Sequence, residues 1–197
     1  MCEIVKNDIL IQYAKKMKFR RGADLSFSLT ADMVCNDIFE IDPETLTGRG
    51  ITLLLADLDN TLVPYGVPLP TDAVREWNER LKAAGVTLFV LSNNRKPNRP
   101  RIFSEGLGVP FIGHAGKPGT AGFVKAMEQM GVSPEQTAIV GDQIFTDILG
   151  GSRAGVFTIL VKPIRLAGNP GRYVRYAVEL PFRAWSKLKK GRAKNER

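Results

Sequence analysis

The hydrophobic residues of this chain fall into two patterns that alternate along it. One pattern consists of short, mainly apolar runs of four to six residues, bounded by glycine or by polar side chains. Runs of this length are typical of strands that are buried on both faces of a parallel sheet. They predict strands at residues 51–56, 86–91, 109–112, 137–140 and 156–161.

The second pattern has the period of an amphipathic helix. Thr71 is suited to cap a helix whose buried face carries Val74, Trp77 and Leu81, and Gly85 is suited to end it. Further helices are expected near 100–105, along Phe123, Met127 and Met130, over 146–154, and after Asp42, where Pro43 suits a first helical position. Strands that alternate with helices predict an α/β fold with a central parallel sheet and helices on both faces.

Polar side chains follow three of the predicted strands directly. Asp57 and Asp59 come after the run at 51–56, Ser92 comes after the second strand, and Asp142 comes after the strand at 137–140. In a parallel sheet the carboxyl ends of the strands meet at one edge, where ligands bind. We therefore expect these side chains to share one site.

The residue types at this edge favour phosphoryl transfer. A carboxylate can attack phosphorus and carry an aspartyl-phosphate, and a second carboxylate two residues away can protonate the leaving group. Carboxylate oxygens suit Mg²⁺, which shields the anionic nucleophile from an anionic substrate. Lys117, Asp142 and Asp147 supply the further ammonium and carboxylate groups that such a site needs.

Four segments together resemble the haloacid dehalogenase superfamily of phosphatases. The segment 57–62, DLDNTL, resembles its first motif, DxDxT, and Ser92 with Asn93 resembles its second. Lys117-Pro118 resembles the third, and the segment 141–147, GDQIFTD, resembles the fourth. The resemblance covers residues 50–165 and implies a Rossmann-like fold and a phosphoric monoester hydrolase that needs Mg²⁺.

The resemblance implies the catalytic roles. Asp57 would be the nucleophile and a metal ligand, and Asp59 would be the general acid and base, with its backbone carbonyl on the metal. Lys117 would balance the charge of Asp57 and of the phosphoryl group. An Asp two residues after the nucleophile favours phosphatase over dehalogenase chemistry in this family.

The resemblance also implies the binding roles. Thr61 would order the first loop, and Ser92 and Asn93 would bind the phosphate together with Lys117. Asp142 would bind Mg²⁺. Asp147 would bind it directly, through water, or act by orienting Lys117.

The spacing of the motifs leaves no room for an inserted cap domain. Asp57 and Ser92 are 35 positions apart, Ser92 and Lys117 are 25 apart, and both intervals are filled by predicted elements. The site should therefore be open, which suits large or surface-bound phosphate esters. The segment DLDNTLVP with its flanks resembles subfamily IIIA and its YqeG-like branch, which is related to the phosphatidylglycerophosphate phosphatases. This implies a lipid head-group phosphomonoester as substrate.

The positive charge of the chain lies at its ends. The 197 residues carry a net charge of +8; residues 165–197 hold ten Lys or Arg and two Asp or Glu, whereas residues 1–164 hold 18 of each sign. We interpret the chain as one domain, 1–197, with a catalytic core at 50–165, a basic arm at 1–22 and a basic tail at 165–197. Pro181 predicts that the tail forms two short helical pieces rather than one.

Two interpretations of the basic ends remain open. They could contact an anionic membrane, since each Lys or Arg near such a surface contributes about 1 kcal/mol, or the tail could be a helix packed on the body with a solvated basic end. No nucleic-acid reader motif is present. The alternative function is a scaffold protein that associates with RNA or the ribosome and keeps a phosphatase-like body.

The remaining composition predicts a cytoplasmic protein, peripheral to the inner face of the membrane if the basic ends bind there. Two cysteines, Cys2 and Cys35, give no disulfide framework. No apolar run approaches the length of about 18 residues that suggests a membrane-spanning helix. The N-terminus lacks the apolar region of a signal peptide.

Overall fold

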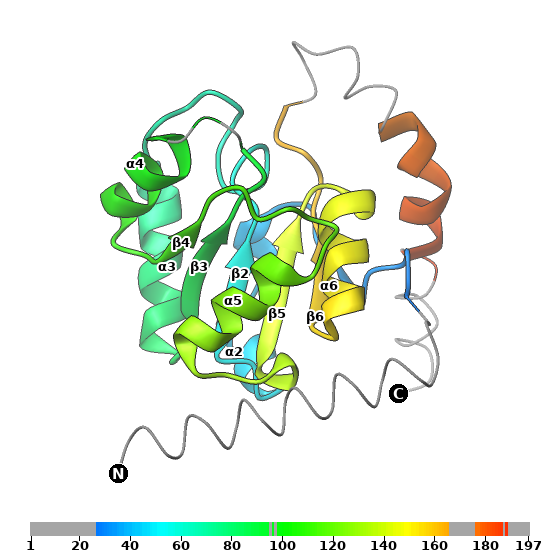
Figure 1. Ribbon diagram of the computed structural model, residues 1–197, viewed down its shortest axis with the longest axis horizontal. Coiled ribbons are helices and arrows are strands. Elements are labelled where there is room, and N and C mark those ends of the chain that lie inside the picture. Colours follow the sequence, from blue (N-terminus) through cyan, green and yellow to red (C-terminus); the bar gives the residue numbers. More distant parts are fainter. Residues whose placement is uncertain (1–26, 95, 97, 166–175, 187, 189–197) are drawn as a thin grey trace.

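The computed structural model describes residues 27–94, 96, 98–165, 176–186 and 188 (Figure 1). The predicted basic arm at 1–22 lies outside these residues, as does most of the basic tail. Within the described residues no helix is both long and apolar enough to cross a membrane.

A six-stranded sheet of parallel strands forms the centre of the described part of the chain (Figure 1). Its strand order is β1-β6-β5-β2-β3-β4. The strands are β1 (Met33–Val34), β2 (Leu53–Ala56), β3 (Thr87–Leu91), β4 (Phe111–Ile112), β5 (Thr137–Gly141) and β6 (Phe157–Leu160). The five predicted strands are confirmed, and β1 is an addition at the edge of the sheet, where it pairs with β6.

Helices cover both faces of the sheet (Figure 1). The α-helices are α2 (Pro43–Thr47), α3 (Asp72–Ala83), α4 (Asn98–Leu107), α5 (Ala121–Met130) and α6 (Leu149–Ala154). The short 3₁₀-helices are η1 (Ile38–Glu40) and η2 (Pro134–Gln136), and η3 (Ile144–Ile148) is a π-helix. Side chains of α2, α3 and α4 pack on one face of the sheet, and those of α5 and α6 on the other. The α/β class with helices on both faces is thereby confirmed.

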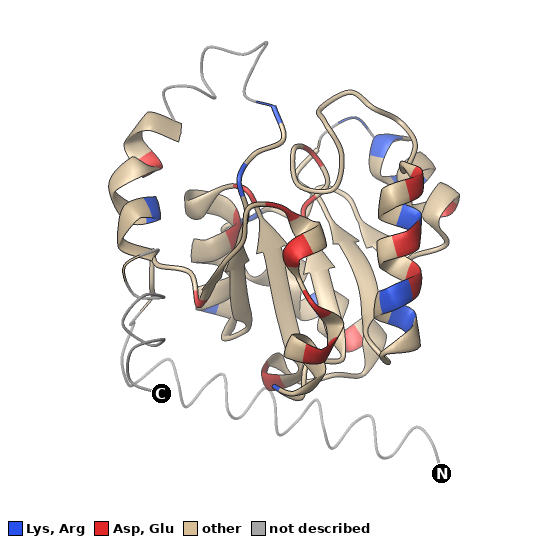
Figure 2. Ribbon diagram, turned by 180° about the vertical axis from the view of Figure 1, so that it is seen from behind, with Lys and Arg blue, Asp and Glu red and all other residues tan. Residues whose placement is uncertain are grey.

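Helix α3 shows why the sequence pattern was informative. The hydroxyl of Thr71 accepts a hydrogen bond from the backbone N–H of Val74 at 3.3 Å, as expected of an N-cap. Trp77 and Leu81 are fully buried, and each such side chain contributes about 1.5–3 kcal/mol by leaving water. Gly85 follows the helix with a φ of 81°, which glycine adopts without strain. The opposite face of α3 carries interleaved charges (Figure 2).

The intervals between the motifs hold only the expected elements. Between β2 and β3 the chain forms a loop and α3, and between β3 and Lys117 it forms α4 and β4. Among the described residues of these two intervals there is no further folded unit, so they form no inserted cap at the carboxyl edge of the sheet. The prediction of a capless fold is confirmed.

The prediction that Pro181 divides the tail is wrong. Residues 176–186 form one helix that runs through Pro181 (orange in Figure 1). Pro181 lies on the exposed side of this helix, so the carbonyl that loses its partner is on the side of solvent. The inner side is held to the body by the buried residues Glu179, Arg183 and Ser186.

Candidate active site

The site is built at the carboxyl ends of the three central strands. In the sheet Ala56 of β2 lies level with Val90 of β3 and with Val140 of β5. The backbone N–H of Asp57 donates to the carbonyl of Val140 at 3.0 Å, which extends this alignment by one residue. Asp57, Ser92 and Asp142 therefore begin the loops at neighbouring points of one edge, as predicted.

Lys117 joins two of the predicted carboxylates. Its Nζ lies 2.7 Å from Oδ1 of Asp57 and 2.7 Å from Oδ1 of Asp147, and all three residues are buried. Asn93 fixes the backbone of this lysine: its Nδ2 donates to the Lys117 carbonyl at 2.8 Å, and its Oδ1 accepts from the Lys117 N–H at 2.9 Å. The second and third motifs are thus tied together by one side chain.

Three carboxylates converge beside this lysine. Asp57, Asp142 and Asp147 each offer an oxygen, and these oxygens lie within 4.8 Å of one another. With every group ionised, three carboxylates and one ammonium leave two uncompensated negative charges, which a divalent cation would balance. Hard oxygen donors are the ligands that Mg²⁺ prefers. The residues present therefore fit a divalent metal.

Burial and neighbouring charges shift the pKa values of these groups. Burial raises the pKa of Asp57 to about 6, although Lys117 acts in the opposite direction. Burial, together with the charges of Asp57 and Asp147, raises the pKa of Asp142 well above its usual value. Burial acts to lower the pKa of Lys117, but the two carboxylates outweigh it and the pKa is raised, so the lysine is charged at neutral pH.

Asp147 is positioned by the unusual backbone that follows β5. The π-helix η3 carries it, and its Oδ2 accepts a hydrogen bond from the backbone N–H of Gln143 at 3.1 Å. Gly141 makes the necessary space, because a Cβ at this position would lie 2.3 Å from Cγ of Asp147. Gly141 of the fourth motif thus allows Asp147, the second aspartate of that motif, to take its position.

Asp59 is not one of the three clustered carboxylates, and it contacts two partners that the sequence did not reveal. Arg99 donates from Nε to Oδ1 of Asp59 at 2.8 Å, and its Nη2 lies 2.7 Å from the same oxygen. Asn94 donates from Nδ2 to Oδ2 at 2.6 Å. The position of Asn94 beside the second motif was a usable signal, whereas Arg99 stands in a polar stretch without a recognisable pattern.

Two hydroxyl groups lie in the loops of the site. The Oγ of the buried residue Ser92 accepts from the backbone N–H of Asn94 at 3.1 Å, so its own proton is available for another acceptor. The Oγ1 of Thr61 is buried and has no hydrogen-bond partner among the described residues. A buried hydroxyl without a partner is costly, which is consistent with a role in ordering a ligand or water.

The fold and the site define a class of protein. A capless parallel α/β sheet presents a buried aspartate, a lysine bound to it, a further carboxylate pair and a hydroxyl at one edge. This set can attack phosphorus, neutralise a phosphoryl group and hold a divalent cation. These groups are typical of a hydrolase of phosphate esters, and the three carboxylates among them could hold a divalent cation.

Comparisons with known proteins agree with this class. The family model described as "haloacid dehalogenase-like hydrolase" matches residues 8–155, so the chain belongs to this hydrolase family. The probable phosphatase YqeG of Bacillus subtilis is 40% identical over 159 residues, which cover 81% of this chain and 91% of that protein. The expected superfamily and its YqeG-like branch are thereby confirmed.

Two further relatives carry the name of a lipid phosphatase. The chloroplastic phosphatidylglycerophosphate phosphatase 1 of Chlamydomonas reinhardtii is 28% identical over 157 residues, covering 76% of this chain and 58% of that protein. The mitochondrial phosphatidylglycerophosphatase GEP4 of Saccharomyces cerevisiae is 25% identical over 133 residues, covering 61% and 72%. The chain thus spans less than two thirds of the algal relative.

Proposed function

We propose that this chain is a Mg²⁺-dependent phosphatase that forms an aspartyl-phosphate on Asp57 and that its substrate is phosphatidylglycerophosphate. The observation that carries the proposal is the contact of Lys117 with both Asp57 and Asp147 beside the third carboxylate, Asp142. The site residues predicted from the sequence keep the roles given above.

The first half of the reaction uses the buried nucleophile. An oxygen of Asp57 attacks phosphorus, the bond to the ester oxygen breaks, and Asp59 gives its proton to the leaving alcohol. Lys117, Ser92 and the amide of Asn93 bind the phosphoryl oxygens. Asp57, Asp142, Asp147 and the Asp59 carbonyl would hold Mg²⁺, which would supply the charge neutralisation that lets an anion approach a carboxylate.

In the second half of the reaction Asp59 acts as a base instead of an acid. Its carboxylate takes a proton from water, the water oxygen attacks phosphorus, and the bond to Asp57 breaks to release inorganic phosphate. Arg99 and Asn94 contact both oxygens of Asp59, so they fix its orientation toward the water and the leaving group.

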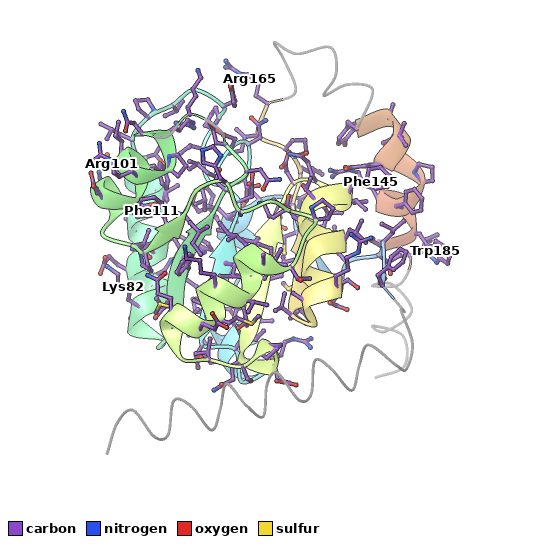
Figure 3. The ribbon with its side chains drawn as sticks, in the orientation of Figure 1. Lys82, Arg101, Phe111, Phe145, Arg165 and Trp185 are labelled. Atoms are coloured by element: carbon purple, nitrogen blue, oxygen red, sulfur yellow. The ribbon has the colours of Figure 1, made fainter. Side chains whose placement is uncertain are left out.

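The open site and the C-terminal helix support a lipid substrate. The described residues form no cap over the carboxyl edge of the sheet, which suits a phosphate ester carried on a surface. On the outward side of the helix at 176–186 and just beyond it, Val178, Leu180, Trp185 and Leu188 are each about half exposed or more. Figure 3 shows Trp185 pointing away from the body. Apolar side chains next to a basic tail suit peripheral binding to an anionic bilayer.

Hydrolysis assays test the proposal in two steps. The chain should hydrolyse p-nitrophenyl phosphate only with a divalent cation, and phosphatidylglycerophosphate in anionic vesicles with a higher kcat/KM. Asp57→Asn should lower both rates roughly 10⁴-fold or more. Absence of cation-dependent turnover on any phosphomonoester would instead favour a scaffold role. Turnover of soluble esters without activity on vesicles would reject only the lipid substrate.

A further inference from the structure

Two charged side chains are buried on the inner side of the C-terminal helix. Glu179 is 1% exposed and Arg183 is 8% exposed, and Arg183 Nη2 lies 3.0 Å from Glu179 Oε2, one helical turn away. A buried ion pair adds little stability on balance, because removing both charges from water is costly. The role of this pair is therefore indicated by the backbone groups that it contacts rather than by a contribution to stability.

Glu179 binds the start of the segment that carries Asp147. Its Oε1 accepts hydrogen bonds from the backbone N–H of Ile144 at 2.9 Å and from that of Phe145 at 3.3 Å. These are the first two amides of the π-helix η3, which have no earlier carbonyl within the helix to bind. The carboxylate of Glu179 thus takes the place of a cap at the beginning of η3.

Arg183 binds the other side of the same segment. Its Nη2 donates to the backbone carbonyl of Asp142, and its Nη1 donates to the carbonyl of Val161 at 3.4 Å. The ring of Phe182 meets that of Phe145 edge-on at 5.8 Å between centroids. Figure 3 shows Phe145 between α6 and the C-terminal helix. The C-terminal helix therefore contacts the segment 142–145 at both of its ends.

We propose that Glu179 and Arg183 are positioning residues that hold the segment from Asp142 to Asp147 in its metal-binding arrangement. The C-terminal helix, which lies outside the four motifs, thereby sets the affinity of the site for the divalent cation. This inference rests on the proposed function, since it requires that Asp142 and Asp147 bind the cation.

Repulsion between the carboxylates of the site gives a physical reason why the segment needs these contacts. Asp57, Asp142 and Asp147 repel one another at their short separation, so without restraint the loop after β5 would relax away from Asp57. The hydrogen bonds that Glu179 and Arg183 make with this loop oppose that relaxation. The loop is therefore ordered before the cation binds. Residues that orient ligands in this way typically change metal affinity or activity 10–100-fold when they are replaced.

The chain offers a matched control on the same helix. The Oγ of Ser186 accepts a hydrogen bond from the backbone N–H of Ala31 at 3.1 Å, which anchors the helix to the segment before β1 rather than to the metal-binding segment. Ser186→Ala should therefore disturb helix packing without changing the site. Glu179→Gln keeps an oxygen acceptor for the two amides and serves as the conservative variant of Glu179→Ala.

The test is a Mg²⁺ titration of the full chain by calorimetry, with Mn²⁺ binding by electron paramagnetic resonance as a second readout. Glu179→Ala and Arg183→Met should weaken cation binding about tenfold or more, Glu179→Gln should recover part of the loss, and Ser186→Ala should match the unaltered chain. At saturating Mg²⁺ the kcat of the variants should return toward the unaltered value.

The outcomes separate the two proposals. If the unaltered chain binds no divalent cation, the proposed function fails. If it binds the cation and all variants bind it equally tightly, the positioning role is overturned while the proposed function stands. Should Glu179→Ala fail to fold, Glu179→Gln and Arg183→Lys decide the matter, and unchanged affinity in both would overturn the inference.

Discussion

The guanidinium group of Arg99 lies against the carboxylate of Asp59, with Nε 2.8 Å and Nη2 2.7 Å from Oδ1. This pair joins the first motif to helix α4, 40 residues later in the chain. It is sheltered, with 8% of the Arg99 side chain and 14% of the Asp59 side chain exposed, so solvent screens it less than a surface ion pair.

Removing this contact should lower the chemical rate. In Arg99→Met the carboxylate of Asp59 loses its fixed orientation, and kcat should fall about 10²-fold, because small misplacements of a catalytic group cost that much. Steady-state kinetics on p-nitrophenyl phosphate measure this, and KM should change little. Arg101→Met is the control, since Arg101 pairs with Glu105 on the exposed surface. An equal loss in both variants would contradict the role of Arg99.

Gly141→Ala should damage the cation site specifically. Its new Cβ would meet Asp147 at 2.3 Å, so the carboxylate must move away from Lys117. Overpacking of this kind costs about 1–3 kcal/mol of the free energy of unfolding, and cation binding should weaken as well. Gly113→Ala is the matched control, because its nearest neighbour would be an ordinary 3.6 Å away. Thermal unfolding with and without Mg²⁺ measures both effects, and a normal Mg²⁺ response in Gly141→Ala would contradict this explanation.

The stabilisation by Mg²⁺ should depend on pH. Burial raises the pKa of Asp57 in the folded chain from 3.8 to about 6, so the folded state binds this proton more tightly than the unfolded state does. Without metal, this group's contribution to stability is therefore greatest below about pH 4 and is lost as the pH rises through about 6. Because cation binding requires the deprotonated carboxylate, the increase in Tm caused by Mg²⁺ should grow over the same rise in pH.

Differential scanning fluorimetry at pH 5 and pH 7.5, with Mg²⁺ or with EDTA, checks this dependence. A shift of equal size at both values would show that the bound cation does not compete with protons at these carboxylates. Asp57→Asn should reduce the difference between the two pH values, because its amide does not titrate, whereas Asp142, whose pKa burial also raises, keeps part of it.

Much of the fold could be predicted because the strands differ clearly from their surroundings. β2 and β5 are entirely buried, and apart from Thr137 at the start of β5 each appears as an apolar run. β1 was not predicted because it is two residues long and its pairing with β6 depends on tertiary contact. The path through Pro181 could not be predicted either, since propensity carries no information about which side of a helix faces the body.

The site was predictable where a motif places a residue at a strand end. Asp57, Ser92 and Asp142 are such cases, because parallel strands bring their carboxyl ends together. Arg99 and Glu179 were not predicted. Each reaches the site from a helix, and only the packing of α4 or of the C-terminal helix determines which side chain meets which loop.

Trapping of the intermediate tests the central claim most directly. Borohydride added during turnover of p-nitrophenyl phosphate reduces an aspartyl-phosphate to homoserine, which mass spectrometry of the digested chain locates. The account predicts homoserine at position 57, dependent on both substrate and Mg²⁺ and absent from Asp57→Asn. Turnover that leaves Asp57 unlabelled, or that places homoserine at another aspartate, would contradict it.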